Sequence, residues 1–163
     1  MPVEFLMDLS AIDLGSVLLD QEQIKKYLQQ RYELLQVDAV IDYDRVNNTL
    51  VGLKKVRHDE IWVRGHIPGR PVMPGVLVIE AAAQIATIHV KLDRENIGED
   101  ITDKFFGFGG VNNVKFRQPV LPGNNLIILT RITRYRSRSF VVRAQGIIDG
   151  KAVFEGDIVG MII

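Results

Sequence analysis

Two side chains near the middle of the chain can exchange protons, one in a loop-like stretch and one in an apolar stretch. His66 lies in the segment 64–70, where two glycines and a proline disfavour regular packing. An imidazole titrates near neutral pH, so we expect His66 to act as a general base. Glu80 lies among aliphatic and alanine residues, where burial disfavours a charged carboxylate. We therefore expect Glu80 to act as a general acid.

Each of these residues also has an ordinary explanation. A lone histidine in a loop is more often a structural or surface residue than a catalytic one. A buried glutamate can be kept for an ion pair with a buried arginine, because an unpaired carboxylate is costly in an apolar setting. The neighbouring residues have to decide between the two explanations.

Two neighbours of Glu80 favour a chemical role. Gly75 follows Pro74 at the expected start of a helix, where free backbone N–H groups can hold an oxygen as negative charge develops. Gln84 is four residues beyond Glu80 on the same helix face, so its amide can hydrogen-bond and orient the carboxyl group. A base, an acid and an oxyanion site are the groups that proton transfer beside a carbonyl requires.

The segment that holds Glu80 predicts a buried helix from Gly75 to about Lys91. Aliphatic residues occupy every face of it, which is typical of an enclosed helix. Four alanines keep it slim, so neighbouring backbones can approach closely: Ala81, Ala82, Ala83 and Ala86. Only about 16 residues are expected to be helical, fewer than the roughly 20 that a membrane span needs. We therefore expect an antiparallel sheet curled around one central helix, and no membrane span.

Six stretches predict the strands of that sheet. Residues 37–46 and 49–56 are rich in β-branched side chains and flank Asn47-Asn48, which tolerates positive φ in a tight turn. A polar connector at 93–103 precedes four more stretches: 105–116, 126–137, 140–149 and 153–163. The last two flank Asp149-Gly150, a strong hairpin signal.

The N-terminal part of the chain contributes one short helix. Asp20 and Gln23 have the spacing of a capping box, which predicts an amphipathic helix ending near Arg31. The start of the chain lacks the basic residues of a secretory signal, so we expect a cytoplasmic protein. The length of 163 residues fits one α+β domain, residues 1–163, in which residues 1–20 form an extension without an assigned role.

Composition limits the classes of function. Lys plus Arg and Asp plus Glu both total 20, so no net charge attracts nucleic acid. The lack of cysteine excludes disulfides, thiolate nucleophiles and cysteine-based zinc sites. His58 and His89 have no metal-binding setting, so we expect surface or core residues, no metal site and no cofactor.

Two further clusters have open interpretations. Three phenylalanines follow the polar connector and suit a core or the wall of a substrate channel equally well: Phe105, Phe106 and Phe108. Three arginines alternate and should share one face of a strand: Arg134, Arg136 and Arg138. The arginines suit a solvated face better than a docking patch for an acidic partner.

The segment 64–84, RGHIPGRPVMPGVLVIEAAAQ, resembles the signature of the non-isomerising 3-hydroxyacyl-acyl-carrier-protein dehydratases, the FabZ type. That family carries GHFPG, then PVMPGVL, then a Glu that begins an E-A-x-A-Q run. RYELLQVD at 31–38 and VNNVKFRQPVLPGNNL at 111–126 also resemble family stretches. The resemblance covers residues from about 24 to the C-terminus and excludes the first 20.

The resemblance implies a hotdog fold with His66 and Glu80 as the catalytic pair. It implies dehydration of 3-hydroxyacyl thioesters to trans-2-enoyl thioesters in fatty acid biosynthesis, with a base and an acid beside two adjacent carbons. Expected substrate-binding residues are Gly75, Val76, Gln84 and Phe108. The substrate would be carried by acyl carrier protein or coenzyme A. The resemblance further implies a homodimer in which His66 of one subunit faces Glu80 of the other, and a possible trimer of dimers.

Some positions depart from the family pattern, and two other functions stay open. Ile67 replaces a Phe, Gln30 and Glu33 replace a His and a Pro, and Asn124 replaces an Asp. None of these changes removes a reacting group, but they bear on chain length and carrier. A hotdog thioesterase would use a carboxylate to activate water, and a non-catalytic module would only bind acyl thioesters. The presence of both His66 and Glu80 favours the dehydratase.

Overall fold

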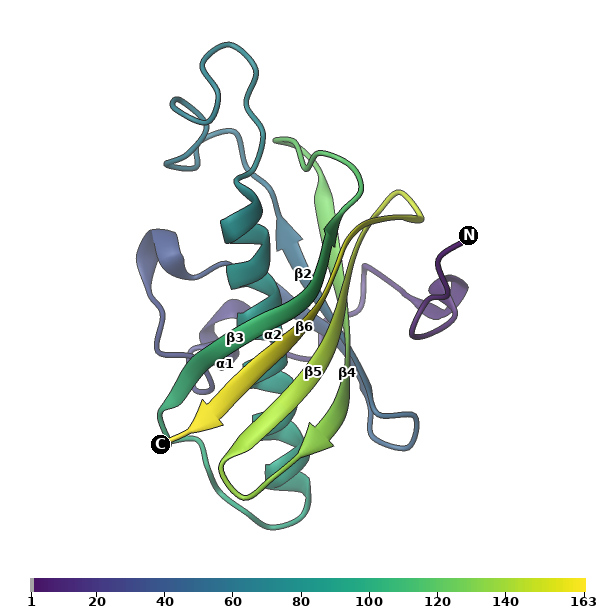
Figure 1. Ribbon diagram of the computed structural model, residues 1–163, viewed down its shortest axis with the longest axis vertical. Helices are drawn as coiled ribbons and strands as arrows, with labels where there is room; N and C mark the ends of the chain where they lie inside the picture. The colour runs from purple at the N-terminus through teal and green to yellow at the C-terminus, as the bar shows by residue number, and fades with distance from the viewer. Residues whose placement is uncertain (1) are drawn as a thin grey trace.

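The computed structural model describes residues 2–163 as one antiparallel sheet with a long helix across one face (Figure 1). The strands are β1 (Ala39–Asp44), β2 (Thr49–Lys55), β3 (Phe106–Phe116), β4 (Asn125–Tyr135), β5 (Ser139–Ile148) and β6 (Lys151–Ile162). Their order in the sheet is β1-β2-β4-β5-β6-β3, and neighbours pair antiparallel. The predicted sheet around one central helix is confirmed.

Both predicted hairpins are present. β1 and β2 are joined through Asn48, which has a φ of 52°. β5 and β6 are joined through Asp149 and Gly150, with φ values of 48° and 74°. Two successive residues at positive φ match the right-handed twist of the flanking strands, which explains the strength of the Asp-Gly signal.

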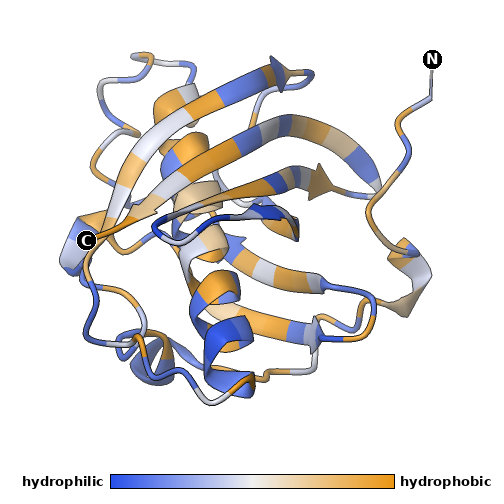
Figure 2. Ribbon diagram, turned by 60° about the horizontal axis from the view of Figure 1, so that its bottom comes forward, coloured by the Kyte–Doolittle hydropathy of each residue, from blue (hydrophilic) through white to orange (hydrophobic). Residues whose placement is uncertain are grey.

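The central helix α2 runs from Gly75 to Asn96, so the end predicted near Lys91 was too early. Its last turns are hydrophilic (Figure 2) but firmly anchored, because Asp93 accepts hydrogen bonds from the hydroxyls of Tyr43 (3.3 Å) and Tyr135 (2.9 Å). With 22 residues α2 could span a membrane by length and composition, contrary to the length estimated from the sequence. However, 61% of its apolar window is buried in the protein, as expected for a core helix.

The first helix is shorter than predicted. Asp20 and Gln23 form the expected capping box, with both hydrogen bonds at 2.9 Å. Helix α1 nevertheless covers only Gln21–Ile24 and does not reach Arg31. The Arg31 guanidinium donates to the carbonyls of Lys25, Leu28 and Gln30, so it fixes the following segment as turns. Short 3-10 turns lie at Leu9–Ala11 and Tyr32–Leu34.

Apolar residues pack on both faces of the sheet. The larger cluster lies between the sheet and α2 and includes Ile85, Ile88 and Phe154. The smaller cluster lies on the outer face, where strands β1, β2, β4 and β5 contact residues 5–12. The N-terminal extension, which had no expected role, therefore covers the sheet face opposite α2.

Candidate active site

His66 lies in the loop that connects β2 to α2, and hydrogen bonds fix its ring. The ring atom Nδ1 is 2.7 Å from the carbonyl oxygen of Val72, whose own N–H donates to the His66 carbonyl (2.9 Å). A carbonyl can only accept a hydrogen bond, so Nδ1 carries the proton in the neutral ring. The tautomer assigned in this way leaves the lone pair on Nε2 available to accept a proton.

Gly75 is the first residue of α2 and lines the same cavity as His66, which has a volume of about 440 Å³. The N–H groups of Leu77 and Val78 bond back to the Pro74 carbonyl. Within residues 2–163, no hydrogen bond is formed by the N–H groups of Gly75 and Val76. Two free amides at the positive end of a helix dipole form a suitable place for a developing oxyanion.

The ring of Phe116 packs directly against Gly75, so a side chain at position 75 would displace the ring. A Cβ atom there would lie 2.8 Å from Cζ of Phe116, closer than real Cβ contacts come. Phe116 is 52% exposed and also lines the His66 cavity. The absence of a side chain thus lets an aromatic ring pack against the start of α2.

Glu80 lies five residues into α2, about 7.5 Å along the axis from Gly75, and is half-buried. The predicted hydrogen bond from Gln84 is present, with Nε2 donating to Oε1 of Glu80 at 2.7 Å. Gln84 is 1% exposed and is itself fixed, because its Nε2 donates to the Leu34 carbonyl (2.6 Å) and its Oε1 accepts from the Gln36 N–H (2.8 Å). The Glu80 carboxyl group is therefore oriented by a rigid amide.

The alternative explanation for Glu80 does not hold. None of the ion pairs in the described part of the chain includes this carboxylate. A half-buried glutamate that is oriented by a buried glutamine and has no cationic partner among residues 2–163 could donate or accept a proton.

His66 and Glu80 line different cavities of the single chain. Glu80 shares a cavity of about 50 Å³ with Gln84 and Phe108, whereas His66 shares its cavity with Gly75. Phe108 is 58% exposed on β3, and Val76 is 72% exposed and lines neither cavity with its side chain. The chain therefore brings Gly75 to His66 and brings Gln84 and Phe108 to Glu80, but residues 2–163 do not join the two groups in one cavity.

The phenylalanine cluster is both core and cavity wall. Phe106 packs on Phe140, with ring centroids 5.4 Å apart, and also lines the Glu80 cavity. A second cavity of about 180 Å³ adjoins it and shares four lining residues with it: Gln30, Thr87, Phe106 and Phe108. Thr87 was missed from the sequence, although its position seven residues after Glu80 places it on the same helix face.

The other histidines and the arginine cluster lie away from these cavities. His89 is buried, its Nδ1 is 2.8 Å from the Thr130 hydroxyl, and burial lowers its pKa to about 4 against the opposing charge of Asp93. His58 is exposed in the loop after β2. Residues 2–163 contain no group of three His, Cys, Asp or Glu that could hold a metal.

The prediction that the three arginines share a strand face was wrong. Arg134 is in β4, but the strand ends at Tyr135, so Arg136 and Arg138 lie in the turn before β5. The guanidinium of Arg94, in the last turns of α2, lies over the ring of Tyr135 at 4.4 Å from the centroid. The turn is therefore at the opposite end of α2 from His66.

The chain is similar in sequence to known dehydratases. Residues 28–157 match the FabA-like domain. The 3-hydroxyacyl-acyl-carrier-protein dehydratase FabZ of Clostridium botulinum is 37% identical over 144 residues, which cover 88% of this chain and 96% of that protein. The FabZ dehydratase of Paramagnetospirillum magneticum is 38% identical over 151 residues, covering 93% and 91%.

A solved structure supports the fold. The dehydratase heterocomplex ApeI:P from Xenorhabdus doucetiae superposes with a TM-score of 0.71 at 16% sequence identity, covering 86% of this chain and 90% of that one. The sheet wrapped around α2 is a hotdog fold, as expected.

Proposed function

The chain belongs to the FabA-like family, and we propose from this membership that it removes water from 3-hydroxyacyl thioesters to give trans-2-enoyl thioesters in fatty acid biosynthesis. The observation that carries the proposal is the setting of His66 in a structure of this family. Its Nδ1 is held by the Val72 carbonyl, its Nε2 is free, and it shares a cavity with the amide end of α2. The enzyme is a lyase, and in the proposed reaction its own side chains and backbone amides carry the proton transfers and hold the developing charge.

In the proposed reaction, Nε2 of His66 removes a proton from C2 of the substrate. Negative charge moves to the thioester oxygen, which accepts hydrogen bonds from the amides of Gly75 and Val76. The C3–O bond then breaks, and the Glu80 carboxyl donates its proton to the departing hydroxide, which leaves as water. The proton on His66 returns to Glu80 through solvent, so the enzyme is restored.

We propose that two subunits assemble each site. His66 and Glu80 line separate cavities in one chain, so a second copy is needed to bring His66 of one subunit to Glu80 of the other. Strand β3 supports this arrangement, because it pairs only with β6 and has no fully buried residue along its 11 residues. Although its pairing with β6 shifts register at two places, an edge strand with exposed apolar groups such as Phe108 is a template for pairing with another chain. A trimer of such dimers is consistent with the family.

The acyl chain has a natural path along α2. The two adjoining cavities lead from Glu80 past Thr87 to Lys91. The Lys91 ammonium lies 4.8 Å from the centroid of the Phe106 ring and donates to the Thr102 carbonyl at 2.9 Å. We propose that the chain lies against Phe106 and Phe108 and that Lys91 limits its length.

The carrier of the thioester is either acyl carrier protein or coenzyme A, in a cytoplasmic enzyme. The exposed arginine turn at 136–138 is far from His66 along α2, which does not favour it as the docking patch of the same subunit. Comparing the rates on the two thioesters therefore distinguishes the carriers.

The test supplies 3-hydroxybutyryl or crotonyl thioesters on either carrier and follows the conjugated enoyl absorbance. We expect His66→Ala and Glu80→Gln to lower kcat by at least about 100-fold, the usual contribution of a general acid or base. The matched control is His58→Ala, which removes an exposed loop histidine outside both cavities and should retain the wild-type rate. Equal rates in all variants would refute the mechanism. Release of free thiol would indicate a thioesterase, and binding without turnover a non-catalytic module.

A further inference from the structure

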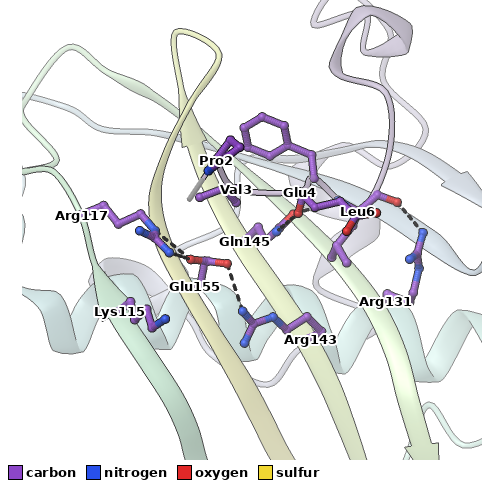
Figure 3. A pocket seen from close by; sticks show the side chains of 11 residues that line it. Pro2, Val3, Glu4, Leu6, Lys115, Arg117, Arg131, Arg143, Gln145 and Glu155 are labelled. Atoms are coloured by element: carbon purple, nitrogen blue, oxygen red, sulfur yellow. Dashed lines mark hydrogen bonds and ion pairs between the residues drawn. The ribbon is translucent and has the colours of Figure 1, made fainter.

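A further cavity of the protein lies outside the proposed active site. It has a volume of about 540 Å³ and lies between the N-terminal residues 2–6 and the outer face of the sheet, opposite α2 (Figure 3). Its floor is made by side chains that point outward from β3, β4, β5 and β6. We call it the outer pocket.

The register of the strands gathers cationic side chains in the outer pocket. Arg131 of β4 is directly opposite Arg143 of β5, and Lys115 of β3 is opposite Glu155 of β6. Arg117, just after β3, completes a set of four cations in the lining. Two arginines directly opposite each other on one face repel, so this pairing is costly unless something compensates it.

Part of this positive charge is compensated within the pocket. Arg117 Nε donates to Oε2 of Glu155 at 2.7 Å, and Arg143 Nη2 donates to Oε1 at 3.0 Å. Arg143 also donates to Asp157 at 3.2 Å. Burial alone would raise the pKa of Glu155, but hydrogen bonds and charges from Arg117 and Arg143 outweigh it and lower the pKa. Glu155 thus stays ionised and holds both guanidinium groups in place.

Two cations of the outer pocket have no such partner. Among residues 2–163, no carboxylate lies within ion-pair distance of Lys115 or Arg131. The Arg131 guanidinium contacts only the Leu6 carbonyl, and its buried Nε has no hydrogen-bond partner in the described chain. A buried donor without an acceptor costs free energy, so the Arg131 guanidinium is incompletely satisfied within residues 2–163.

The N-terminal segment forms a fixed wall of the outer pocket. The Leu6 N–H donates to Oε1 of Gln145 at 2.9 Å, and Nε2 of Gln145 donates to the Glu4 carbonyl at 2.9 Å. Gln145 is 3% exposed, so the segment is attached to the sheet through a buried amide. In Figure 3 the segment crosses above Gln145 while the cationic side chains lie along the strands on either side.

We propose that the outer pocket binds a phosphate group. Two positive charges lack a carboxylate partner, and a phosphate ester or inorganic phosphate brings nearly two negative charges and several acceptor oxygens. Arginine recognises phosphate through paired N–H donors, and Lys115 adds a point charge. The group belongs either to a free inorganic anion or to a nucleotide. This site is separate from the proposed dehydration, with Arg117 alone lining both the outer pocket and the His66 cavity.

Isothermal titration calorimetry at low salt tests the proposal with sodium pyrophosphate, adenosine 3′,5′-bisphosphate and sodium acetate. We expect both phosphates to bind the wild-type protein and acetate not to bind. Tighter binding of the bisphosphate would identify a nucleotide as the source, and tighter binding of pyrophosphate a free anion. Lys115→Met and Arg131→Met should each weaken binding about tenfold, the effect of one charge-assisted hydrogen bond.

The matched control is Arg134→Met, which removes an exposed arginine from the same strand as Arg131 but outside the outer pocket. It should bind phosphate as the wild type does. Lys115 is exposed and outside every ion pair, so Lys115→Met should fold normally and keep the test decisive if Arg131→Met does not fold. No heat of binding with either phosphate, or equal affinity in wild type, Lys115→Met and Arg134→Met, would overturn the proposal.

Discussion

Gln84 is the residue whose replacement most sharply tests how the acid is positioned. Its amide joins Glu80 to the Leu34 carbonyl and the Gln36 N–H through three hydrogen bonds, and the side chain is almost completely buried. Gln84→Met keeps the length and most of the volume of the side chain but removes all three bonds. Two backbone groups and one carboxylate then lose a partner.

The magnitude follows from the groups left behind. The Gln36 N–H is buried, so leaving it without a partner costs about 1–3 kcal/mol, whereas Leu34 is 55% exposed and water can replace the amide at its carbonyl. For a chain of this size, each kcal/mol lowers Tm by about 2–4 °C. We therefore expect Tm to fall by about 2–12 °C. Loss of the hydrogen bond that orients the Glu80 carboxyl should lower kcat by about 10- to 100-fold with little change in KM, because positioning acts on the chemical step.

The assay combines thermal unfolding with steady-state dehydration of a 3-hydroxybutyryl thioester. Thr133→Val is the control, because Thr133 lies outside both cavities and its exposed hydroxyl donates only to the Val141 carbonyl. The control should keep both Tm and kcat near wild type. A Gln84→Met protein with wild-type kcat would show that Glu80 needs no orienting partner, and one with wild-type Tm would refute the energetic argument.

Three further predictions concern packing, the N-terminal segment and pH. Gly75→Ala should lower kcat at least about tenfold and lower the free energy of unfolding by about 1–3 kcal/mol, because the new Cβ displaces the Phe116 ring. In the control Gly65→Ala the Cβ meets nothing within 4 Å, so kcat and the free energy of unfolding should match wild type. Deleting residues 2–12 should expose the smaller apolar cluster on the outer face of the sheet and lower the free energy of unfolding in urea by on the order of 3 kcal/mol. Unchanged stability would mean that this packing contributes nothing. Burial lowers the pKa of His89 to about 4 in the folded protein, below the ordinary 6.5. Its contribution to the free energy of unfolding is therefore complete above pH 6.5 and is lost as pH falls towards 4. The total loss is about 3 kcal/mol. His89→Gln should flatten this part of the stability profile in urea titrations at pH 7.5 and 5.0, and an unchanged slope would contradict the assignment.

The local pattern of the sequence determined the strands, both hairpins and the central helix. These features depend on period-two alternation, on Asn and Asp-Gly turns, and on the apolar run after Gly75, all of which act over a few residues. Helix ends were predicted less well. Arg31 fixes turns after α1 through local bonds to nearby carbonyls, whereas Tyr43 and Tyr135, from distant strands, hold the extra turn of α2.

The sequence also determined the Gln84–Glu80 contact, because spacing on one helix fixes which side chains are neighbours, and His66 and Glu80 stay predictions as the reacting groups. Only the tertiary structure decided that His66 and Glu80 line separate cavities, that Leu34 and Gln36 fix Gln84, and that residues 2–12 cover the outer face. These facts depend on contacts between segments far apart in the chain. The same holds for the outer pocket, where Lys115 and Arg131 converge through strand register although no local pattern connects them.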